Sequence, residues 1–284
     1  MSETLENSFQ LGRFKIDGRV AVITGGAGLL GRMHAEAIAE AGGIPVVADL
    51  HLAPALEVAE KIRAQFGTPA LGLACNVTNR ESVEALRDAV LAQFGRLDIL
   101  INNAANNPKV EGGAKGQAHF SRFEGFSESQ WDMDLDVTLK GAFLCSQICG
   151  SEMARAGRGV ILNILSDLAL IAPDHRLYRQ PGVPEEQQPV KPVTYSVTKA
   201  GLMGLTRYLA TYWADRGVRS VALSPGGVFN GQPEEFVGRV SALIPLGRMA
   251  RADEYKGAIQ FLVSDASSYM TGSNLVVDGG RTTW

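Results

Sequence analysis

RVAVITGGAGLLG, residues 19–31, is the stretch of sequence that decides the fold. Its first half is a short run of β-branched and other apolar residues, which predicts a buried strand; residues 29–42 have the apolar spacing of an amphipathic helix. Gly25, Gly28 and Gly31 lie at the junction of the two. Glycines there let the backbone turn sharply and approach a pyrophosphate, whose charge meets the free N–H groups of the helix N-terminus. We therefore expect a dinucleotide-binding βα unit, with a tight turn that binds nothing as the alternative.

The same alternation of strand and helix patterns continues along the chain and is typical of a parallel sheet with crossover helices. Further strands are predicted over 43–50, 70–77, 97–104, 159–165, 219–225 and 274–280. Helices are predicted over 53–66, 80–94, 127–156, 195–215, 233–243 and 253–264. The fold class is thus α/β, a three-layer, doubly wound fold with seven parallel strands. No linker divides the sequence, so we expect an N-terminal arm, 1–13, and one domain, 14–284.

The composition excludes several classes of protein. The 284 residues carry 27 basic and 30 acidic side chains, with no long run of like charges, which argues against a nucleic-acid groove or a basic membrane patch. The three cysteines, Cys75, Cys145 and Cys149, have neither disulfide nor zinc spacing, so we expect reduced, buried thiols and no metal site. The sequence shows no signal peptide and no apolar stretch of roughly 18 residues, which predicts a cytoplasmic protein.

Asp49 ends the second predicted strand, 24 residues after Gly25. A carboxylate at this place hydrogen-bonds the 2′-hydroxyl of a ribose and repels a 2′-phosphate. Neither Leu50 nor His51 is an arginine that would reverse this preference. We therefore expect NAD rather than NADP as the cofactor.

Tyr195 and Lys199 lie four residues apart at the start of a predicted helix, so both side chains share one helix face. A lysine ammonium near a phenol lowers the pKa of the phenol and lets it exchange protons near neutral pH. Ser166 ends the fifth predicted strand, at the sheet edge where ligands of parallel sheets bind, and its hydroxyl could polarise a substrate carbonyl. Together they predict a proton-transfer site, whereas the two helix residues alone would also suit a solvated pair.

Six motifs, in this order, resemble those of the short-chain dehydrogenase/reductase family: TGxxxxxG at 24–31, NNAA at 102–105, Ser166, YSVTK at 195–199, SPGG at 224–227 and VDGG at 277–280. The resemblance implies a Rossmann-type fold, hydride transfer between a nicotinamide and a secondary alcohol or ketone, and a homo-oligomer, a tetramer or a dimer. It also implies that Tyr195 is the general acid/base, that Lys199 binds the nicotinamide ribose and that Ser166 orients the substrate.

The cofactor-binding residues follow from the glycine turn, from Asp49 and from the resemblance. They are Gly25, Gly28, Leu30, Gly31, Asp49, Leu50, Asn76, Val77, Asn103, Ala104, Tyr195, Lys199, Pro225, Gly226 and Val228. The sequence departs from the family pattern at Leu29, where a glycine is usual, and at Asn76, where an aspartate is usual. Thr138, included among the catalytic residues, and Val221 each stand in place of an asparagine. The backbone carbonyl of Thr138 would have to serve the proton relay.

These departures keep other functions open beside an NAD-dependent oxidoreductase. One alternative is an NAD-using sugar epimerase or dehydratase, and another is a non-catalytic dinucleotide-binding regulatory subunit. A weaker resemblance to a branch associated with bacterial surface-sugar and flagellin-glycan modification suggests a sugar or sugar-derived substrate. The partners expected are therefore a small alcohol or carbonyl compound and copies of the same chain, with no nucleic acid and no membrane.

Two insertions, at about 105–127 and 167–194, extend the predicted substrate side of the domain. The second carries several cations, among them Arg176, Arg179 and Lys191. Arginine recognises phosphate or carboxylate with two parallel hydrogen bonds, so Arg176 and Arg179 are candidates for binding an anionic substrate group. The equally plausible alternative is that they pair with Glu185 and Glu186 on a solvated loop.

Overall fold

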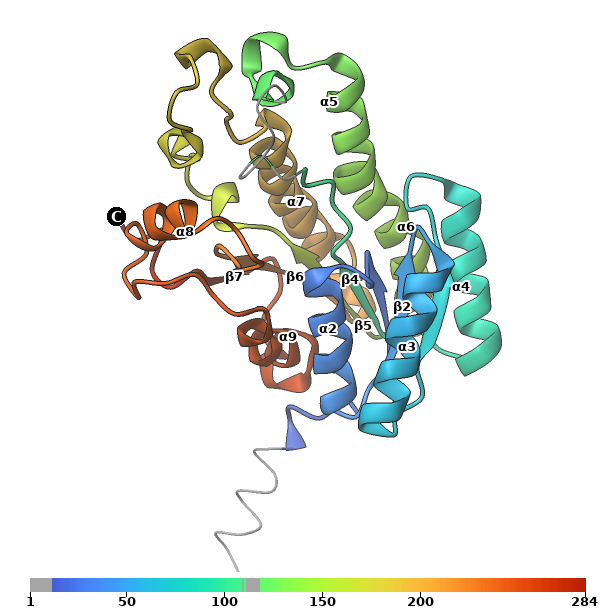
Figure 1. Ribbon diagram of the computed structural model, residues 1–284. Helices are drawn as coiled ribbons and strands as arrows, with labels where there is room; N and C mark the ends of the chain where they lie inside the picture. The colour runs from blue at the N-terminus through green and yellow to red at the C-terminus, as the bar shows by residue number, and fades with distance from the viewer. Residues whose placement is uncertain (1–11, 109, 111–117) are drawn as a thin grey trace, which may run out of the picture.

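Seven parallel strands form a single sheet in the order β3-β2-β1-β4-β5-β6-β7. The computed structural model describes residues 12–108, 110 and 118–284. The strands are β1 (Val20–Thr24), β2 (Ile44–Asp49), β3 (Leu71–Ala74), β4 (Ile99–Asn102), β5 (Gly159–Ile164), β6 (Val218–Pro225) and β7 (Asn274–Val277) (Figure 1). The α/β fold class and the seven parallel strands predicted from the sequence are confirmed.

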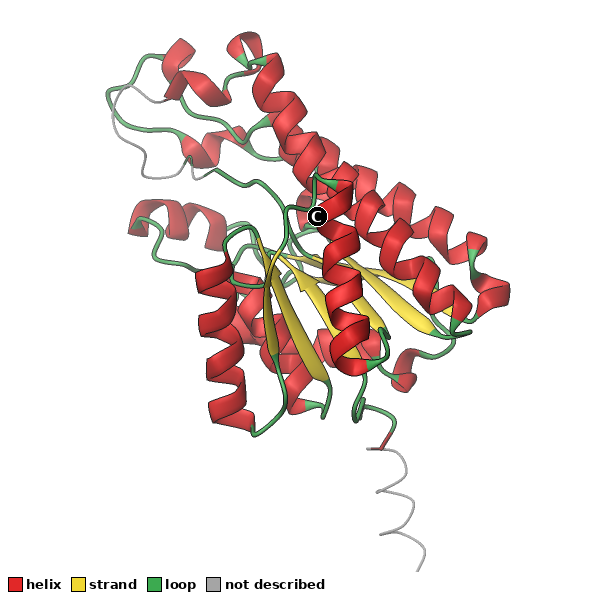
Figure 2. Ribbon diagram, turned by 90° about the vertical axis from the view of Figure 1, so that its right-hand side faces the viewer, coloured by secondary structure: helices red, strands yellow, loops and turns green. Residues whose placement is uncertain are grey.

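Helices cover both faces of the sheet, so that the strands lie between two helical layers (Figure 2). The helices are α2 (Leu29–Glu40), α3 (Leu52–Phe66), α4 (Arg80–Phe94), α5 (Glu128–Leu135), α6 (Gly141–Arg155), α7 (Val193–Tyr212), α8 (Glu234–Ser241) and α9 (Lys256–Val263). Buried residues of α2, α3 and α9 pack on one face, and those of α4, α6 and α7 pack on the other. None of the helices in the described ranges has both the length and the apolar composition needed to span a membrane.

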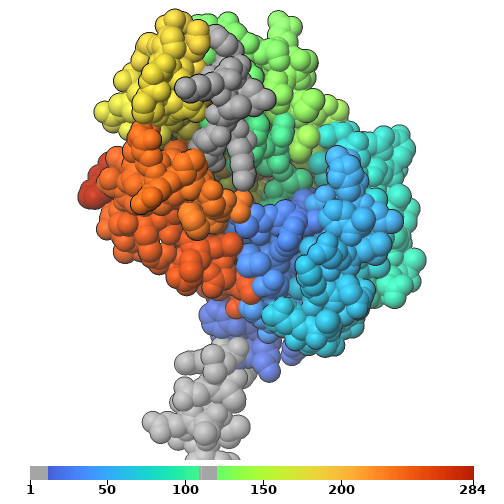
Figure 3. All heavy atoms as spheres, viewed as in Figure 1, coloured from blue at the N-terminus to red at the C-terminus, as the bar shows by residue number. Residues whose placement is uncertain are grey.

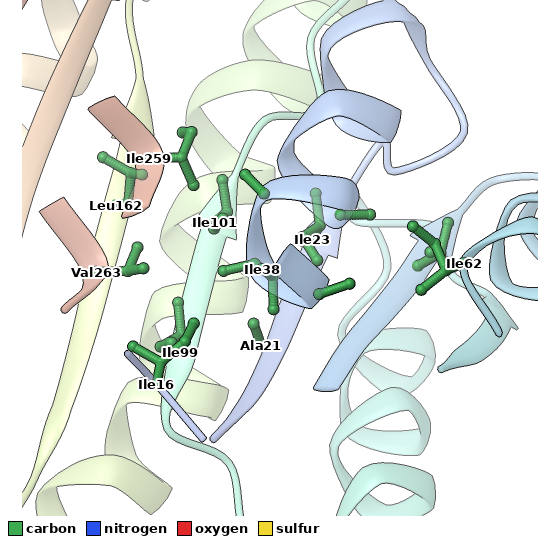
Figure 4. Close-up of a cluster of buried hydrophobic side chains, with 14 of the residues drawn as sticks. Ile16, Ala21, Ile23, Ile38, Ile62, Ile99, Ile101, Leu162, Ile259 and Val263 are labelled. Carbon is green, nitrogen blue, oxygen red and sulfur yellow. The ribbon is translucent and has the colours of Figure 1, made fainter. Parts of the chain in front are cut away.

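Aliphatic side chains from three helices fill the core on the first face (Figure 4). Ile38 of α2, Ile62 of α3 and Ile259 of α9 pack with Ile23 of β1 and Ile101 of β4, and all are nearly or fully buried. Parallel strands are buried on both faces, which explains why they read as continuous apolar runs rather than alternating ones. The three cysteines are buried free thiols in the other layer, as expected.

The strand order reverses between β1 and β4, and this topological switch point positions the site. From β1 the chain proceeds through β2 to β3 at one edge, and then returns to β4 on the other side of β1. The loops after β1 and β4 therefore diverge and leave a crevice at the carboxyl ends of the strands.

The helix predicted over 127–156 is interrupted by a wide turn. Its two parts, α5 and α6, are joined by a π-helical turn, Asp136–Lys140, which contains Thr138. An apolar pattern does not reveal one extra residue in a turn, and such π turns occur frequently at functional sites.

The two insertions contain short 3₁₀ turns in place of longer helices. The first contains η1 (Ala118–Ser121) and η2 (Phe123–Gly125), whereas its residues 109 and 111–117 lie outside the described residues, as does nearly all of the predicted arm, 1–13. The second contains η4 (Asp167–Ala169), η5 (His175–Tyr178) and η6 (Glu185–Gln187). Its η5 turn contacts α8, and Figure 3 shows this neighbourhood where the yellow segment meets the orange C-terminal region. The division into an arm and a single domain stays a prediction.

Candidate active site

A cavity of about 470 Å³ lies at the carboxyl ends of β1, β2 and β4. Every predicted cofactor residue except Val228 lines it. The lining residues that sequence reasoning did not name as cofactor ligands are Leu29, Cys75, Ala105, Asn107, Val137, Ile164 and Leu165. Cys75 and Ala105 directly adjoin a predicted ligand after a strand, so a wider window around each strand end would have found these two.

The glycine turn after β1 brings the backbone close to the cavity. Gly25 has φ +59°, and a Cβ on Gly31 would lie only 2.2 Å from the carbonyl oxygen of Gly25. Helix α2 begins directly after Gly28, with no acidic residue in its first turn and no side chain capping it. The unpaired N–H groups and the positive end of the helix dipole thus face the cavity, and the first turn of the helix carries no carboxylate that would compete for them. This arrangement fits the pyrophosphate of a dinucleotide.

Leu29, where the sequence departs from the family pattern, is the first residue of α2 and is 41% exposed. Positive φ is confined to glycines among the described residues, so the backbone at this position does not require glycine. Its side chain lies at the rim of the cavity. The turn is therefore formed without the middle glycine of the usual pattern.

Asn103 joins the loops that follow β1 and β4. Its side-chain amide donates hydrogen bonds to the carbonyl oxygens of Thr24 (2.9 Å) and Gly25 (3.0 Å). In return, the Thr24 hydroxyl accepts hydrogen bonds from the backbone N–H groups of Asn103 and Ala104, both at 3.1 Å. Four hydrogen bonds thus fix the crevice at the switch point before any ligand binds.

Asp49 and Asn76 lie at the ends of β2 and β3, on the same cavity. Oδ2 of Asp49 accepts a hydrogen bond from the backbone N–H of Ala27 at 3.0 Å, which ties the carboxylate to the glycine turn. Oδ1 of Asn76 accepts hydrogen bonds from the N–H and the hydroxyl of Thr78. Asn76 therefore shapes its own loop in addition to lining the cavity.

A second cavity, of about 450 Å³, opens beside the first and shares Leu29, Asn107, Tyr195 and Gly226 with it. Its lining includes polar side chains and an apolar cluster from η5, α8 and the segment that follows α8. The polar group includes Asn107, Ser166, Asp167 and Lys191, and the apolar group includes Leu177, Tyr178, Phe236, Val240, Ile244 and Met249. Tyr195 is thus placed where the two cavities meet.

Two lysines approach the ring of Tyr195. Nζ of Lys199 lies 5.9 Å from the ring centroid and donates a 2.8 Å hydrogen bond to the carbonyl oxygen of Ile164. Nζ of Lys191 lies closer, 3.8 Å from the centroid. Burial, and secondarily the charge of Lys191, lowers the pKa of Lys199 to about 8. Two ammonium groups therefore lie near the ring of Tyr195.

Ser166 lines the second cavity and is 4% exposed. Its hydroxyl donates a 2.7 Å hydrogen bond to Oδ1 of Asp167 and accepts one from the N–H of Leu168. Burial raises the pKa of Asp167, with the Ser166 hydrogen bond acting in the opposite direction. The orientation of the Ser166 hydroxyl is thus set by its neighbour in sequence.

The SPGG and VDGG motifs pack against each other at the far side of the first cavity. A Cβ on Gly226 would lie 2.7 Å from the Cα of Asp278, so only glycine allows this approach. The carboxylate of Asp278 accepts hydrogen bonds from the N–H groups of Gly280 (2.9 Å) and Thr282 (2.7 Å). The contact holds Pro225 and Gly226 at the cavity wall.

Other predicted site residues lie away from the first cavity. Val228 lines the second cavity instead, and the buried Thr138 lines neither of the two. Val221, the other departure from the pattern, is a fully buried core residue of β6. The roles assigned to these residues stay predictions.

The two arginines of the second insertion pair with carboxylates of their own loop. Arg176 binds Asp174 through two hydrogen bonds, of 2.9 and 2.7 Å, and Arg179 binds Glu185 at 2.7 Å. The side chains of Arg176 and Arg179 are 79% and 55% exposed. The sequence left open that both arginines pair with Glu185 and Glu186 on a solvated loop. Arg179 does pair with Glu185, whereas Arg176 pairs with Asp174.

Comparison with protein families shows to which family the chain belongs. A family model described as short chain dehydrogenase matches residues 19–177, and one described as Enoyl-(Acyl carrier protein) reductase matches residues 184–282. The chain belongs to the short-chain dehydrogenase/reductase family. This short-chain dehydrogenase/reductase is an oxidoreductase that acts on CH–OH groups, and it binds a nicotinamide dinucleotide.

Individual members of the family match almost the whole chain. It is 37% identical over 277 residues to a D-threitol dehydrogenase of Mycolicibacterium smegmatis, covering 95% of each chain. It is 32% identical over 275 residues to an NAD-dependent glycerol dehydrogenase of Listeria innocua, covering 95% of this chain and 96% of the relative. A solved structure of a gluconate 5-dehydrogenase from Burkholderia cenocepacia, in complex with NADP and tartrate, matches with a TM-score of 0.83 at 29% identity, covering 96% and 99%.

Proposed function

We propose that the protein is an NAD-dependent dehydrogenase of small polyhydroxylated alcohols that interconverts a secondary hydroxyl and a ketone with Ser166, Tyr195 and Lys199. The observation that carries the proposal is the position of Tyr195 at the junction of the two cavities. A proton-transfer group is most effective within hydrogen-bond reach of both the reacting oxygen and the groups that tune it.

Tyr195 would take the hydroxyl proton during oxidation and return it during reduction. The ammonium of Lys199 supports this exchange because a positive charge near the ring favours the phenolate. A bound nicotinamide would supply the hydride acceptor, which no protein side chain can replace. Ser166 would donate a hydrogen bond to the carbonyl oxygen of a ketone substrate, for which its hydroxyl would have to turn away from Oδ1 of Asp167, its acceptor in this structure.

The preference for NAD is supported by the end of β2. The carboxylate of Asp49 lines the first cavity, and the next residue, Leu50, is an exposed apolar side chain. A 2′-phosphate placed there would meet a negative charge with no cation from either lining residue. Relatives and solved neighbours include both NAD-dependent and NADP-bound proteins, so the argument rests on Asp49.

The substrate class is supported by the second cavity and by the relatives. Asn107, Lys191 and Asp167 offer hydrogen-bond donors and acceptors near Tyr195, as hydroxyl groups beside the reacting carbon require. The named relatives act on the free polyols threitol and glycerol rather than on nucleotide-linked sugars. A polyol is therefore the first substrate to test, ahead of the glycan precursors suggested by the weaker sequence resemblance.

We also propose a cytoplasmic homo-oligomer. Helices α6 and α7 expose Phe143 (47%), Tyr208 (61%) and Tyr212 (59%), large apolar or aromatic side chains of the kind that association buries. Mass measurement in solution tests this assembly, and a monomer at micromolar concentration would contradict it.

The test of the function is Tyr195→Phe, with Tyr208→Phe on the same helix as the matched control. With NAD and D-threitol, glycerol or mannitol as substrates, we expect Tyr195→Phe to lower kcat by roughly 10²–10⁴-fold. NADH binding, followed by fluorescence, should stay largely intact. Activity retained by Tyr195→Phe would overturn the assignment. NADH binding by the wild type without net NADH production would favour the epimerase or regulatory alternatives.

A further inference from the structure

Lys191 lies over the ring of Tyr195, although it comes from the insertion rather than from the YSVTK motif. Its Nζ is 3.8 Å from the ring centroid, compared with 5.9 Å for Nζ of Lys199. Lys191 is 9% exposed and lines the second cavity beside Ser166. A buried cation on the face of the candidate acid/base is thus present in addition to the lysine of the motif.

Contacts between the two insertions hold Lys191 in this position. Its ammonium donates a 2.8 Å hydrogen bond to Oδ1 of Asn107, in the loop after β4. The N–H of the preceding residue, Val190, donates to the hydroxyl of Ser121 in η1. On the following side, Thr194 donates to the buried carboxylate of Asp134, which also accepts a hydrogen bond from Asn106. The backbone on both sides of Lys191 is therefore anchored.

Several charged groups nearby form ion pairs within the part of the chain that the structure describes. Around a third cavity, of about 540 Å³, which Lys191 also lines, Arg122 pairs with Glu124 and Arg179 pairs with Glu185. Arg176 pairs with Asp174, and His175 lies between them in sequence. On the substrate side, Asp167 and Arg281 line the same cavity as Lys191, and the charge of Arg281 acts on Asp167. From α7 itself, Lys199 faces Tyr195.

We propose that Lys191 is a positioning residue of the proton-transfer site, whose ammonium stabilises the ionised form of Tyr195 from the face of the ring. A cation over a neutral aromatic ring gains a modest cation–π attraction, whereas the same cation beside a phenolate gains the attraction of a full charge. The equilibrium therefore moves toward phenolate. This inference rests on the proposed function, because it assigns Lys191 to the chemistry of Tyr195.

Lys191 also acts on Lys199, and the size of its total effect depends on pH. The charge of Lys191 contributes to lowering the pKa of Lys199 to about 8, after burial. Removing Lys191 would thus keep Lys199 charged to a higher pH, which partly compensates above pH 8. Below that pH Lys199 is charged in both proteins, so the loss of the nearer cation dominates.

The experiment measures phenolate formation directly in the full-length protein. The ultraviolet absorbance of ionised tyrosine is followed against pH in the wild type and in Lys191→Gln. The curve of the same protein carrying Tyr195→Phe is subtracted from each, which leaves the signal of Tyr195. Glutamine keeps a donor for Oδ1 of Asn107 while removing the charge. We expect the phenolate midpoint of Tyr195 to rise by about one pH unit. Lys191→Arg, which keeps the charge, should return it toward the wild-type value.

A second readout uses turnover, and a further variant protects the test against misfolding. The acid limb of kcat/KM against pH for D-threitol oxidation should move upward by the same amount in Lys191→Gln. If this variant does not fold, Lys191→Met keeps the apolar stem and takes its place. An unchanged midpoint in a folded variant that binds NADH normally would overturn the proposal and leave Lys191 a purely structural link.

The titration needs no substrate, so failure of this inference differs from failure of the proposed function. A wild type that oxidises no alcohol but shows the shifted midpoint would refute the function and not the role of Lys191. An active wild type without the shift would refute only the role of Lys191.

Discussion

The ammonium of Lys199 donates a 2.8 Å hydrogen bond to the carbonyl oxygen of Ile164, the last residue of β5. This bond fixes the fifth strand to the helix that carries Tyr195, and it holds a buried positive charge beneath the phenol. The buried ammonium can stabilise a negative charge at the site. It also lowers the stability of the folded chain, because it loses its hydration on folding.

The cost of burying Lys199 should appear in the pH dependence of stability. Its pKa falls from 10.5 to about 8 on folding, so between these values the unfolded chain binds more protons than the folded one. Stability contributed by this group therefore rises with pH through the window. Relative to Lys199→Met, the wild type should gain up to roughly 3 kcal/mol in free energy of unfolding between pH 8 and 10.5.

Denaturant unfolding at both pH values measures this difference, and Lys61→Met provides the baseline for losing an exposed lysine on α3. A constant difference between wild type and Lys199→Met across the window would show that the ammonium is not desolvated in the folded chain. Activity should fall in Lys199→Met at every pH, since the phenolate loses its partner from the motif.

The glycine turn makes a graded prediction. A Cβ at Gly31 would lie 2.2 Å from the backbone oxygen of Gly25, whereas a Cβ at Gly28 would lie 3.2 Å from the same atom. Gly31→Ala should therefore destabilise the fold by roughly 1–3 kcal/mol and abolish NADH binding, and Gly28→Ala should be milder in both respects. Gly204→Ala, in an open position on α7, serves as control and should be neutral or stabilising. Equal effects at Gly31 and Gly28 would contradict the geometry.

The charge of Asp49 should decide between the two nicotinamide cofactors. Asp49→Asn keeps an oxygen that can accept the N–H of Ala27 and removes only the negative charge. We expect the ratio of kcat/KM for NAD to that for NADP to fall by about tenfold or more, equivalent to about 1.4 kcal/mol. Adding Leu50→Arg should lower the ratio further, because arginine binds phosphate with two hydrogen bonds. An unchanged ratio in both variants would assign cofactor selection to another part of the cavity.

Much of this site was predictable because its residues lie at strand ends. Gly25, Asp49, Asn103 and Ser166 each follow a short apolar run, and parallel strands bring their carboxyl ends to one edge. The i, i+4 spacing of a helix likewise fixed the relation of Tyr195 and Lys199.

The parts that escaped prediction depend on how irregular chain folds. Lys191 reaches Tyr195 only because the insertion is anchored at Ser121, and Asn107 meets it from a different loop. Neither contact corresponds to a periodic pattern of residues in the sequence. The π turn at Asp136–Lys140 was not predicted for a related reason, since one extra residue barely changes a helical pattern of apolar residues.

The outer wall of the substrate cavity depends on Arg239, which connects α8 to the second insertion. Its guanidinium donates hydrogen bonds to the carbonyl oxygens of Leu177 (3.1 Å) and Arg179 (2.7 Å), beside the ring contact of Tyr178 with Phe236. Arg239→Gln should loosen this wall and raise KM for the polyol roughly three- to tenfold with kcat largely kept, since the lost interaction binds ground state and transition state alike.

The double variant Arg176→Gln/Arg179→Gln removes only exposed ion pairs and should leave KM within about threefold of wild type. Steady-state kinetics on both variants decide the matter: a large KM effect in the double variant with none in Arg239→Gln would mean that the exposed arginines, rather than the clamped wall, contact the substrate.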